Sequence, residues 1–252
     1  MENYLIRIQY TGQYFYGFQK QQGLMTVQGC IEDALSLVLR SSINTFGSSR
    51  TDRGVNALNQ YINFYFENEL DTQYLKMKLN GLLFEKGIAV KEITKVDKLF
   101  HARKSSKGKI YAYIISNNSE KAMFLFPYVY LYKEDIDREL LGKTLGGLKG
   151  KHDFSIFANR DRTQPERYNI CEIFDLGVLD KKDYLVLYFY GDRFLYHMVR
   201  RMVYYILKAS SGHIPEEVII NPFSQKKVPY TRQVLPPGPL FLVDVVYRGL
   251  KK

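Results

Sequence analysis

The stretch FHARKSSKGKIYAYIISN, residues 100–117, separates two parts of the 252-residue sequence that have similar patterns. It opens with basic residues and ends in an alternating apolar run that predicts a strand. Before it, the pattern predicts strand, helix, strand, helix and strand over residues 4–10, 26–40, 57–67, 72–83 and 87–96. After it, we expect helix, strand, strand, helix and strand over residues 136–148, 170–180, 183–192, 194–210 and 238–249. The sequence therefore predicts an α+β fold with helices on one sheet face, and two domains, residues 1–104 and 105–252.

Several of these segments also indicate how they begin and which side they bury. Thr26 is expected to cap the N-terminus of the helix over residues 26–40, because a threonine hydroxyl accepts hydrogen bonds from N–H groups of the first helical turn. For the helix over 72–83 and the strand over 57–67, the side chains predicted to share one apolar face are Leu75, Leu79 and Leu82, and Leu58, Ile62, Phe64 and Phe66.

Residues 194–210 have two different faces at helical spacing. The apolar stripe, expected to be buried, is Leu195, Met198, Val199, Met202 and Ile206. The other face carries His197, Arg200, Arg201, Tyr204 and Lys208. An ordinary solvated face is one interpretation. We favour a face that contacts phosphates, because a solvated face normally mixes charge signs and this one holds no acid.

The charge of the whole chain points in the same direction. Lys and Arg number 36 and Asp and Glu 26, which gives a formal net charge of +10. Residues 98–119, 193–213 and 218–243 contain no acid at all. This excess favours a polyanionic partner, either nucleic acid or an anionic membrane. No basic helix shows an exposed apolar face for insertion, which disfavours a membrane-surface or purely structural protein.

Other classes of function are excluded by missing patterns. The sequence has no GxxxxGK[ST] loop, no GxSxG elbow and no HExxH motif, and its four histidines lack ligand spacing. Cys30 and Cys171 are expected to be free and buried, as suits a reducing cytosol. Glu2 and Arg7 interrupt the N-terminal segment, so it does not read as a signal peptide, and no uncharged stretch approaches the ~20 residues of a membrane span. We expect a cytoplasmic protein without a metal.

The segment GSSRTDRGVNAL, residues 47–58, places one carboxylate, Asp52, between Arg50 and Arg53 in a glycine-containing loop. A surface ion pair would explain it, although such pairs contribute only about 0–1 kcal/mol. A catalytic nucleophile or base also fits, because a neighbouring arginine lowers the pKa of a carboxyl and keeps it ionised. The segment alone leaves both interpretations open.

Six stretches in order resemble the motifs of the tRNA pseudouridine synthase A family. GSSRTDRGVNA resembles its R-T-D-x-G-V-x-A loop, and YTGQYFYGFQKQQGLMTVQG resembles its opening Y-D-G-x-x-Y-x-G-x-Q-x-Q and T/S-V-Q. FHARKSSKGKIYAYII, HDFSIFA, FLYHMVRRMV and GPLFLVDVVY are similar to the remaining four. The resemblance implies two ferredoxin/RRM-like α+β halves with antiparallel sheets, joined around a central basic cleft. It also implies isomerisation of uridine to pseudouridine in the tRNA anticodon stem-loop, at positions 38 to 40, by a homodimer that uses no cofactor and no metal.

The resemblance also implies roles for individual residues. Asp52 is expected to be the catalytic acid, Tyr111 the ring that stacks on the target base, and Arg200 the partner of the acid. The resemblance also makes Arg50 the loop arginine before the acid, and Leu240 and Phe241 the walls of the uracil pocket. The acid-free basic segments and the loop add the remaining expected substrate contacts, which are Arg53, Arg103, Lys107, Lys109, His197 and Arg201.

The sequence departs from the family pattern at four positions. Arg53 and Asn56 stand where Ala and His are common, and Thr11 and Phe18 where Asp and Trp are usual. Arg53 is expected to fill the space left by the extruded base or to hold phosphates. These changes leave open a synthase that modifies another tRNA or rRNA position, and a non-catalytic RNA-binding protein is the remaining alternative. The basic residues of 161–169, Arg162 and Arg167, together with Thr163, could contact RNA or form a charged loop.

Overall fold

The computed structural model of the protein describes residues 1–159, 169–224 and 228–249. The residues Arg162, Thr163 and Arg167 lie outside this part of the chain. Internal contacts divide the chain into two compact units, Met1–Lys107 with Phe241–Lys252, and Gly108–Leu240. Each unit mixes helices with a mostly antiparallel sheet, so the predicted α+β class is confirmed.

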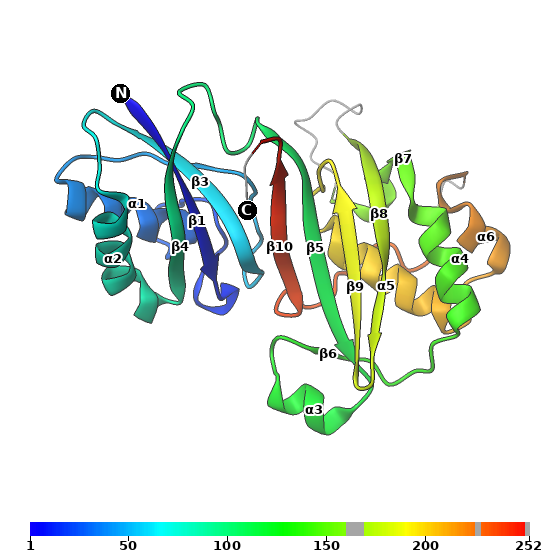
Figure 1. The fold of residues 1–252 in the computed structure, drawn as a ribbon. Coiled ribbons are helices and arrows are strands. Elements are labelled where there is room, and N and C mark those ends of the chain that lie inside the picture. The colour runs from blue at the N-terminus through cyan, green and yellow to red at the C-terminus, as the bar shows by residue number, and fades with distance from the viewer. Residues whose placement is uncertain (160–168, 225–227, 250–252) are drawn as a thin grey trace. The chain divides into compact units, whose positions relative to one another are not determined.

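The first unit is a sheet in the order β4–β1–β3–β10, with α1 and α2 packed on one face (Figure 1). β1 is antiparallel to both of its neighbours, β10 is parallel to β3, and the short β2 pairs with β3. Its strands are β1 (Glu2–Tyr10), β2 (Phe46–Gly47), β3 (Asn56–Phe66), β4 (Ile88–Val96) and β10 (Leu240–Tyr247). Its helices are α1 (Val27–Leu39) and α2 (Thr72–Leu83), with short 3₁₀ turns η1 (Gly12–Tyr14) and η2 (Phe84–Lys86).

Alternation along β1 and a cap on α1 explain how this unit forms. Tyr4, Ile6 and Ile8 alternate along β1 and are buried. Thr26 accepts a hydrogen bond from the Gly29 backbone N–H, as predicted, so α1 begins at its capping hydroxyl. The thiols of Cys30 and Cys171 are free and buried in their respective units, which confirms that prediction.

Two of the predicted faces in this unit are wrong by one position. Leu58 is exposed. The pairing of β1 with β3 shifts register between Ile8 and Tyr10, and this shift breaks the expected alternation in the part of β3 that precedes Ile62. α2 buries Leu83 and leaves Leu82 partly exposed. A helix has 3.6 residues per turn, so the face of Leu75 and Leu79 can continue at the third residue after Leu79, which is Leu82, or at the fourth, which is Leu83. In α2 it continues at Leu83.

The second unit is an antiparallel sheet in the order β5–β9–β8–β7, with β6 parallel to β5. Its strands are β5 (Ser106–Ser116), β6 (Tyr130–Leu131), β7 (Gly150–Asp153), β8 (Ile170–Lys181) and β9 (Tyr184–Gly191). Its helices are α3 (Ser119–Phe124), α4 (Arg138–Leu148), α5 (Met198–Ser210) and α6 (Glu216–Ile220), with 3₁₀ turns η3 (Phe154–Phe157) and η5 (Pro222–Ser224). α4 and α5 lie on one face of this sheet (Figure 1).

α5 differs from its predicted form in two ways. It begins at Met198 rather than at Phe194, because His197 adopts a left-handed conformation with φ of 64° that cannot continue a helix. The helix is also buried on nearly all sides, including Arg201, which the sequence placed on an exposed basic face. Helical spacing alone cannot distinguish a solvated arginine from one that finds buried carbonyl partners.

Candidate active site

Asp52 lies in the loop that joins β2 to β3, residues 48–55, called the Asp52 loop below. The start of this loop is bound to β3. Ser48 donates its backbone N–H to the Tyr61 carbonyl at 2.8 Å and its hydroxyl to the buried Gln60 side chain. The loop therefore leaves the sheet from a fixed point.

The middle of the Asp52 loop is bound to the last residue of β1 and to the segment that follows this strand. The hydroxyls of Tyr10 and Thr51 are 2.7 Å apart, and the Phe18 N–H donates to the Thr51 carbonyl at 3.1 Å. Gly17, with φ of 94°, lies so close that a Cβ there would be 3.0 Å from the same carbonyl oxygen. Thr51 is nearly fully buried, so the backbone that leads into Asp52 is fixed from two sides.

The end of the loop is held by a close backbone approach. A Cβ on Gly12 would lie 2.2 Å from the Val55 carbonyl oxygen, so only glycine fits there. The Gly12 N–H donates to Asn56 Oδ1 at 2.8 Å, which gives this departure from the family pattern a structural role. The Val55 N–H donates back to the Asp52 carbonyl at 3.1 Å, and Gly54 supplies a φ of 80°, so Asp52 sits at a tight turn.

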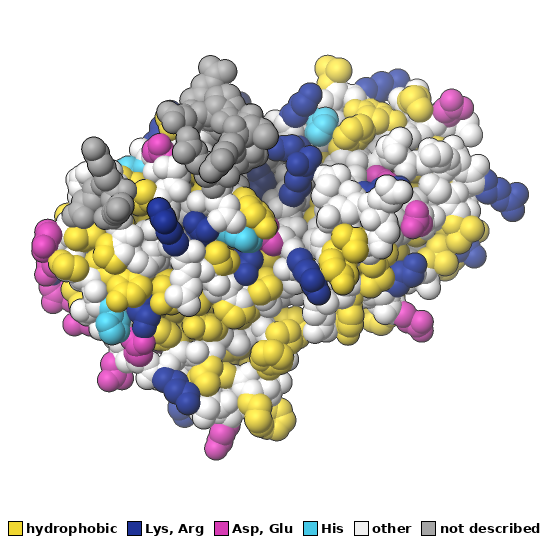
Figure 2. All heavy atoms as spheres, turned by 180° about the vertical axis from the view of Figure 1, so that it is seen from behind, with side chains coloured by type: hydrophobic (Ala, Val, Ile, Leu, Met, Phe, Trp, Pro, Cys, Tyr) yellow, Lys and Arg dark blue, Asp and Glu magenta, His cyan; other side chains and the backbone are white. Residues whose placement is uncertain are grey.

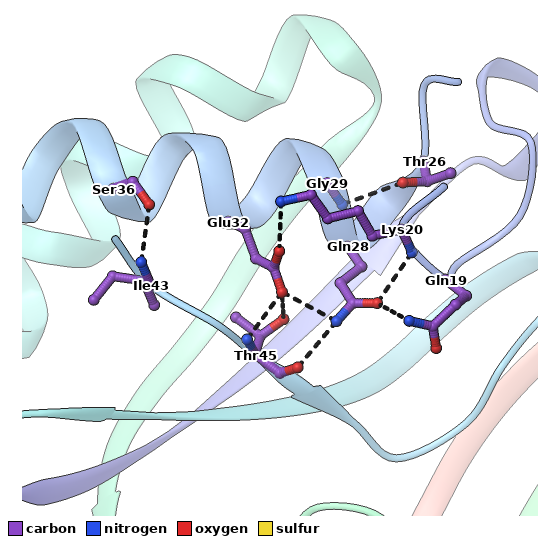
Figure 3. Close-up of polar contacts among 9 residues, drawn as sticks. All are labelled: Gln19, Lys20, Thr26, Gln28, Gly29, Glu32, Ser36, Ile43 and Thr45. Carbon is purple, nitrogen blue, oxygen red and sulfur yellow. Dashed lines mark hydrogen bonds and ion pairs between the residues drawn. The ribbon is translucent and has the colours of Figure 1, made fainter. Parts of the chain in front are cut away.

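Behind the loop, a buried polar network joins α1 to the segments on either side (Figure 3). The Glu32 carboxylate accepts hydrogen bonds from the Thr45 N–H at 2.9 Å, the Thr45 hydroxyl, the Gln28 amide and the Lys20 ammonium at 3.0 Å. The Gln28 amide oxygen accepts from Gln19 at 2.7 Å and from the Lys20 N–H. Glu32, Gln28 and Thr45 are buried, and the hydrogen bond with Glu32 raises the pKa of Lys20. A buried carboxylate with this many donors rigidifies the elements that it joins.

This network fixes the segment that clamps the Asp52 loop. The Val27 and Gln28 N–H groups at the start of α1 donate to the carbonyls of Gly17 and Phe18, at 3.2 and 2.9 Å. The Phe18 ring fills the space beside Gly47, where a Cβ would approach it to 2.2 Å. Phe18 is thus packed against the residue just before the loop, and its N–H binds the loop at Thr51.

The three charged residues of the loop differ in their surroundings. Asp52 is half-buried, whereas Arg50 and Arg53 are exposed. The Arg53 guanidinium lies over the Tyr16 ring, 4.2 Å from its centre. A cation over an aromatic face is stabilised by about 0.5–1 kcal/mol at an exposed site. Arg53 is therefore pre-positioned at the protein surface next to Asp52.

β10 brings Phe241 to the end of the Asp52 loop. Phe241 pairs with Asn56, the residue directly after the loop, in a parallel ladder. Farther along, the Asn59 side chain donates to the Val243 carbonyl at 2.9 Å and keeps the two strands together. The structure thus places Phe241, an expected pocket wall, beside the residue that directly follows the Asp52 loop.

The basic segment from the turn after β4 into the start of β5 presents Arg103 and Lys107 to solvent. Its backbone is anchored by the Ala102 N–H, which donates to Asn63 Oδ1 at 2.9 Å, and by the Ala102 carbonyl, which accepts from Tyr247 at 2.6 Å. Burial, and then the positive charges of Lys104 and Arg103, lower the pKa of His101. These two exposed cations lie on the same unit as Asp52.

In the second unit, the expected stacking ring is held by β5. Tyr111 is buried there and meets the Phe194 ring edge to face, with centroids 5.1 Å apart. Lys109, two residues earlier, pairs with Gly191 of β9 and is half-buried. Leu240, the other expected pocket wall, is buried at the start of β10.

The start of α5 carries the remaining predicted residues. Arg200 is half-buried and donates through Nε to the Leu235 carbonyl at 2.6 Å. Arg201 is buried and donates to the Ala158 carbonyl at 3.0 Å and to the Asn159 side chain. Burial, and then the positive charge of Arg232, lower the pKa of Arg201. The exposed position expected for Arg201 is thus wrong.

Sequence reasoning missed the residues that hold the site rather than form it. Tyr10, Gln60 and Glu32 support the Asp52 loop, and Asn159 contacts the start of α5. Tyr10 and Gln60 lie in predicted strands as ordinary members, so no local signal marked them. Glu32 stands inside the apolar helical pattern of α1, and an acid at such a position was the one available sign of a buried polar network.

The surface is consistent with an anionic partner. On the face drawn in Figure 2, Lys and Arg side chains are exposed among hydrophobic ones. In the described ranges, no cluster of three or more His, Cys, Asp or Glu side chains is arranged to hold a metal ion. No helix within those ranges is both long and apolar enough to cross a lipid bilayer.

Comparison with known proteins identifies the family. The sequence profile of the family described as tRNA pseudouridine synthase matches residues 6–103 and 147–248. Proteins named tRNA pseudouridine synthase A from Caldicellulosiruptor saccharolyticus and Aquifex aeolicus are each 35% identical over 247 residues, 98% of this chain and 100% of theirs. The protein of that name from Oenococcus oeni is 34% identical over 252 residues, 99% of this chain and 100% of its own. The chain therefore belongs to the tRNA pseudouridine synthase family of isomerases.

Proposed function

We propose that the protein isomerises uridine to pseudouridine in the anticodon stem-loop of tRNA, at positions 38 to 40, with Asp52 as the essential group and without a cofactor. The observation that carries this proposal is the clamp on the Asp52 loop. Thr51 is bound by Tyr10 and Phe18, and Gly12 packs against the backbone of Val55. A carboxylate in an ordinary surface ion pair needs no such support, whereas a catalytic carboxylate must be held at a defined position.

The reaction breaks the N1–C1′ glycosidic bond, rotates the uracil and joins C5 to C1′. The detached base must be retained during the rotation, and we propose that Tyr111 stacks on it while Leu240 and Phe241 provide apolar walls. Asp52 acts by attack at C1′, by attack on the base or by removal of the 2′ proton. All three routes need an ionised carboxylate, and we propose that Arg200 keeps it so.

The same proposal assigns the RNA path and the assembly. Arg50, Arg53, Arg103, Lys107 and Lys109 contact the RNA backbone, and the target base is extruded from its stem at a cost of a few kcal/mol. The protein works as a cytoplasmic homodimer, each chain of which has two ferredoxin/RRM-like halves joined around a basic cleft. The basic excess of the sequence supports a polyanionic substrate.

Mapping of pseudouridine on defined RNAs tests the target. Unmodified tRNA and rRNA transcripts are incubated with the protein, and pseudouridine is located by carbodiimide-dependent primer extension. The expected stops fall at positions 38 to 40 and disappear from transcripts in which those uridines are replaced by cytidine. Stops at another tRNA or rRNA position would establish the alternative target, and their absence from every RNA would leave a non-catalytic RNA-binding protein.

A further inference from the structure

Phe46 presents an exposed aromatic ring on the strand that leads into the Asp52 loop. It pairs with β3 as part of β2, yet 39% of its surface is exposed. Its ring centre lies 5.1 Å from that of His101 and 6.2 Å from that of Tyr65, both half-buried. Only Gly47 separates Phe46 from Ser48, where the Asp52 loop begins. These three rings, called the Phe46 cluster below, therefore form a partly exposed aromatic surface at the base of that loop.

Buried amides fix the backbone of the turn that supplies the second ring. Asn3 and Asn63 are fully buried, and Asn63 Nδ2 donates to Asn3 Oδ1 at 3.0 Å. Asn3 Nδ2 donates to the Asp97 and Phe100 carbonyls at 2.9 and 2.8 Å. Asn63 Oδ1 accepts from the Ala102 N–H at 2.9 Å. Buried amides are tolerated only where their hydrogen bonds are made, so this pair binds the turn firmly to the sheet.

His101 contributes an aromatic ring to the cluster rather than a charge. Its Nδ1 accepts a hydrogen bond from the Arg103 N–H at 3.2 Å, and its backbone N–H donates to Ser105 Oγ at 3.1 Å. Burial, and then the positive charges of Lys104 and Arg103, lower the pKa of the imidazole. The ring is therefore neutral at pH 7 and packs beside Phe46 as an aromatic group.

Positive charge without acidic partners lies next to the cluster. Arg103 and Lys104 are exposed, and their charges act on His101, so both lie beside the three rings. Within the described ranges neither of them forms an ion pair, whereas Lys98, earlier in the turn, lies 3.8 Å from Glu2. An exposed ring on a fixed backbone beside two such cations matches a nucleotide, which offers a flat base and a charged phosphate.

We infer that the Phe46 cluster is a nucleotide-binding subsite, in which Phe46 stacks on an unpaired base of the RNA and Arg103 and Lys104 bind the phosphates beside it. Its place in catalysis rests on the proposed function. Every base has a flat face, so the subsite fixes the position of the RNA strand rather than its sequence. Because β2 leads directly into the Asp52 loop, a nucleotide held on Phe46 positions the RNA at the entrance to that loop.

The chain contains no tryptophan, which permits a direct test of stacking. Phe46→Trp places the only indole of the protein in the cluster, and a stacked nucleobase quenches indole fluorescence. We expect a saturating unmodified tRNA transcript, and an oligouridylate at higher concentration, to lower the emission by about half or more. Phe84→Trp is the matched control, because Phe84 is also an exposed phenylalanine of the first unit. Its emission should stay unchanged, and no quenching at Phe46→Trp, or equal quenching in both variants, would overturn the inference.

Binding measurements over a salt series separate stacking from charge. Phe46→Ala should weaken tRNA binding about fivefold to hundredfold, the effect of one stacked base, and keep the slope of log K against log salt. Phe46→Leu keeps an apolar side chain against the other two rings and should weaken binding as well, which covers the case in which alanine disturbs β2. Arg103→Gln combined with Lys104→Gln should reduce the slope by about 1 to 2. Phe84→Ala is the control and should keep both the affinity and the slope.

These measurements do not depend on turnover, so they distinguish the subsite from the proposed function. Quenching at Phe46→Trp together with no pseudouridine in any RNA would refute the proposed function and support the subsite. Pseudouridine formation together with natural affinity in both Phe46→Ala and Phe46→Leu would support the proposed function and overturn the subsite.

Discussion

The Asp52 loop of the first unit and the start of α5 in the second are held in place by different kinds of contact. The loop is clamped mainly through backbone, with Gly12 and Gly17 packed against its carbonyl groups. The turn before α5 is held by side chains, from the buried Arg201 through Asn159 to His197. Backbone contacts fix the position of the chain that carries the carboxylate, whereas side-chain hydrogen bonds also fix the orientation of the groups that they join. A substitution in the clamp should therefore displace the Asp52 loop, whereas a substitution among the side chains before α5 should change the orientation of the groups that they hold.

The sharpest way to break the backbone clamp is Gly12→Ala. Its Cβ would lie 2.2 Å from the Val55 carbonyl oxygen, so the Asp52 loop must move. We expect a loss of about 1–3 kcal/mol in the free energy of unfolding and a fall of about 100-fold in kcat, because small displacements of a catalytic group are costly. Urea denaturation and single-turnover kinetics measure the two effects.

Gly81→Ala is the matched control for this substitution. Gly81 lies in α2 with no atom within 4 Å of an added Cβ. Alanine there should stabilise the protein by about 0.5–1 kcal/mol and leave activity unchanged. Full activity in Gly12→Ala would show that the close approach to Val55 does not position Asp52.

Glu32→Ala tests the network behind the clamp. The substitution leaves the Thr45 N–H and hydroxyl and the Gln28 amide without their acceptor in a buried setting, so we expect a loss of about 2–4 kcal/mol in the free energy of unfolding. Glu69→Ala removes a highly exposed acid that pairs with Lys95 and should change stability by less than about 0.5 kcal/mol. Equal changes in the free energy of unfolding for the two substitutions, measured by urea denaturation, would mean that the network does not stabilise the fold.

Arg53→Ala tests the exposed side of the same loop. Loss of the guanidinium over Tyr16 should weaken tRNA binding about threefold to tenfold and reduce the slope of log K against log salt by about 1, with less than about 1 kcal/mol lost in stability. Filter binding over a salt series measures the slope. Arg138→Ala, which removes an arginine paired with Asp180, is the control and should keep the slope. If both variants keep it, Arg53 does not hold a phosphate.

The smallest effect is expected at the other end of α5. Hydrogen bonds from Lys208 and then His213 lower the pKa of Glu134 to about 2 from 4.5. A lowered pKa stabilises the fold above the unfolded value, and this stabilisation is lost as pH falls from about 5 toward 2. Because the pair is partly exposed, Glu134→Gln should cost less than about 1 kcal/mol at pH 7, and its cost should be smaller at pH 2, where the carboxyl is partly protonated. Urea denaturation at both pH values measures it, and a difference that grows with acid would contradict the assignment.

The sequence predicted the elements of both regions better than the contacts between them. Thr26 marked the start of α1, and periodicity found β1, α2 and β5, because capping and alternation are local. The left-handed His197 and the buried Arg201 were missed, since both depend on Asn159, some 40 positions earlier in the chain.

The same limit applies to the residues of the candidate site. The motif loop identified Asp52, but its support comes from Tyr10, Gly12 and Glu32 in separate elements. Nothing local in the sequence distinguishes a glycine that the clamp requires, such as Gly12, from one that an exposed helix face merely tolerates, such as Gly81 in α2.

The most direct measurement is the single-turnover rate of pseudouridine formation by Asp52→Asn in excess over a tRNA transcript. Asparagine has nearly the same shape as aspartate and should leave the clamp at Thr51 and Val55 in place. We predict that the rate falls by at least about 1,000-fold while tRNA binding changes by less than about threefold. A rate close to that of the natural protein would contradict the assignment of Asp52 as the essential group.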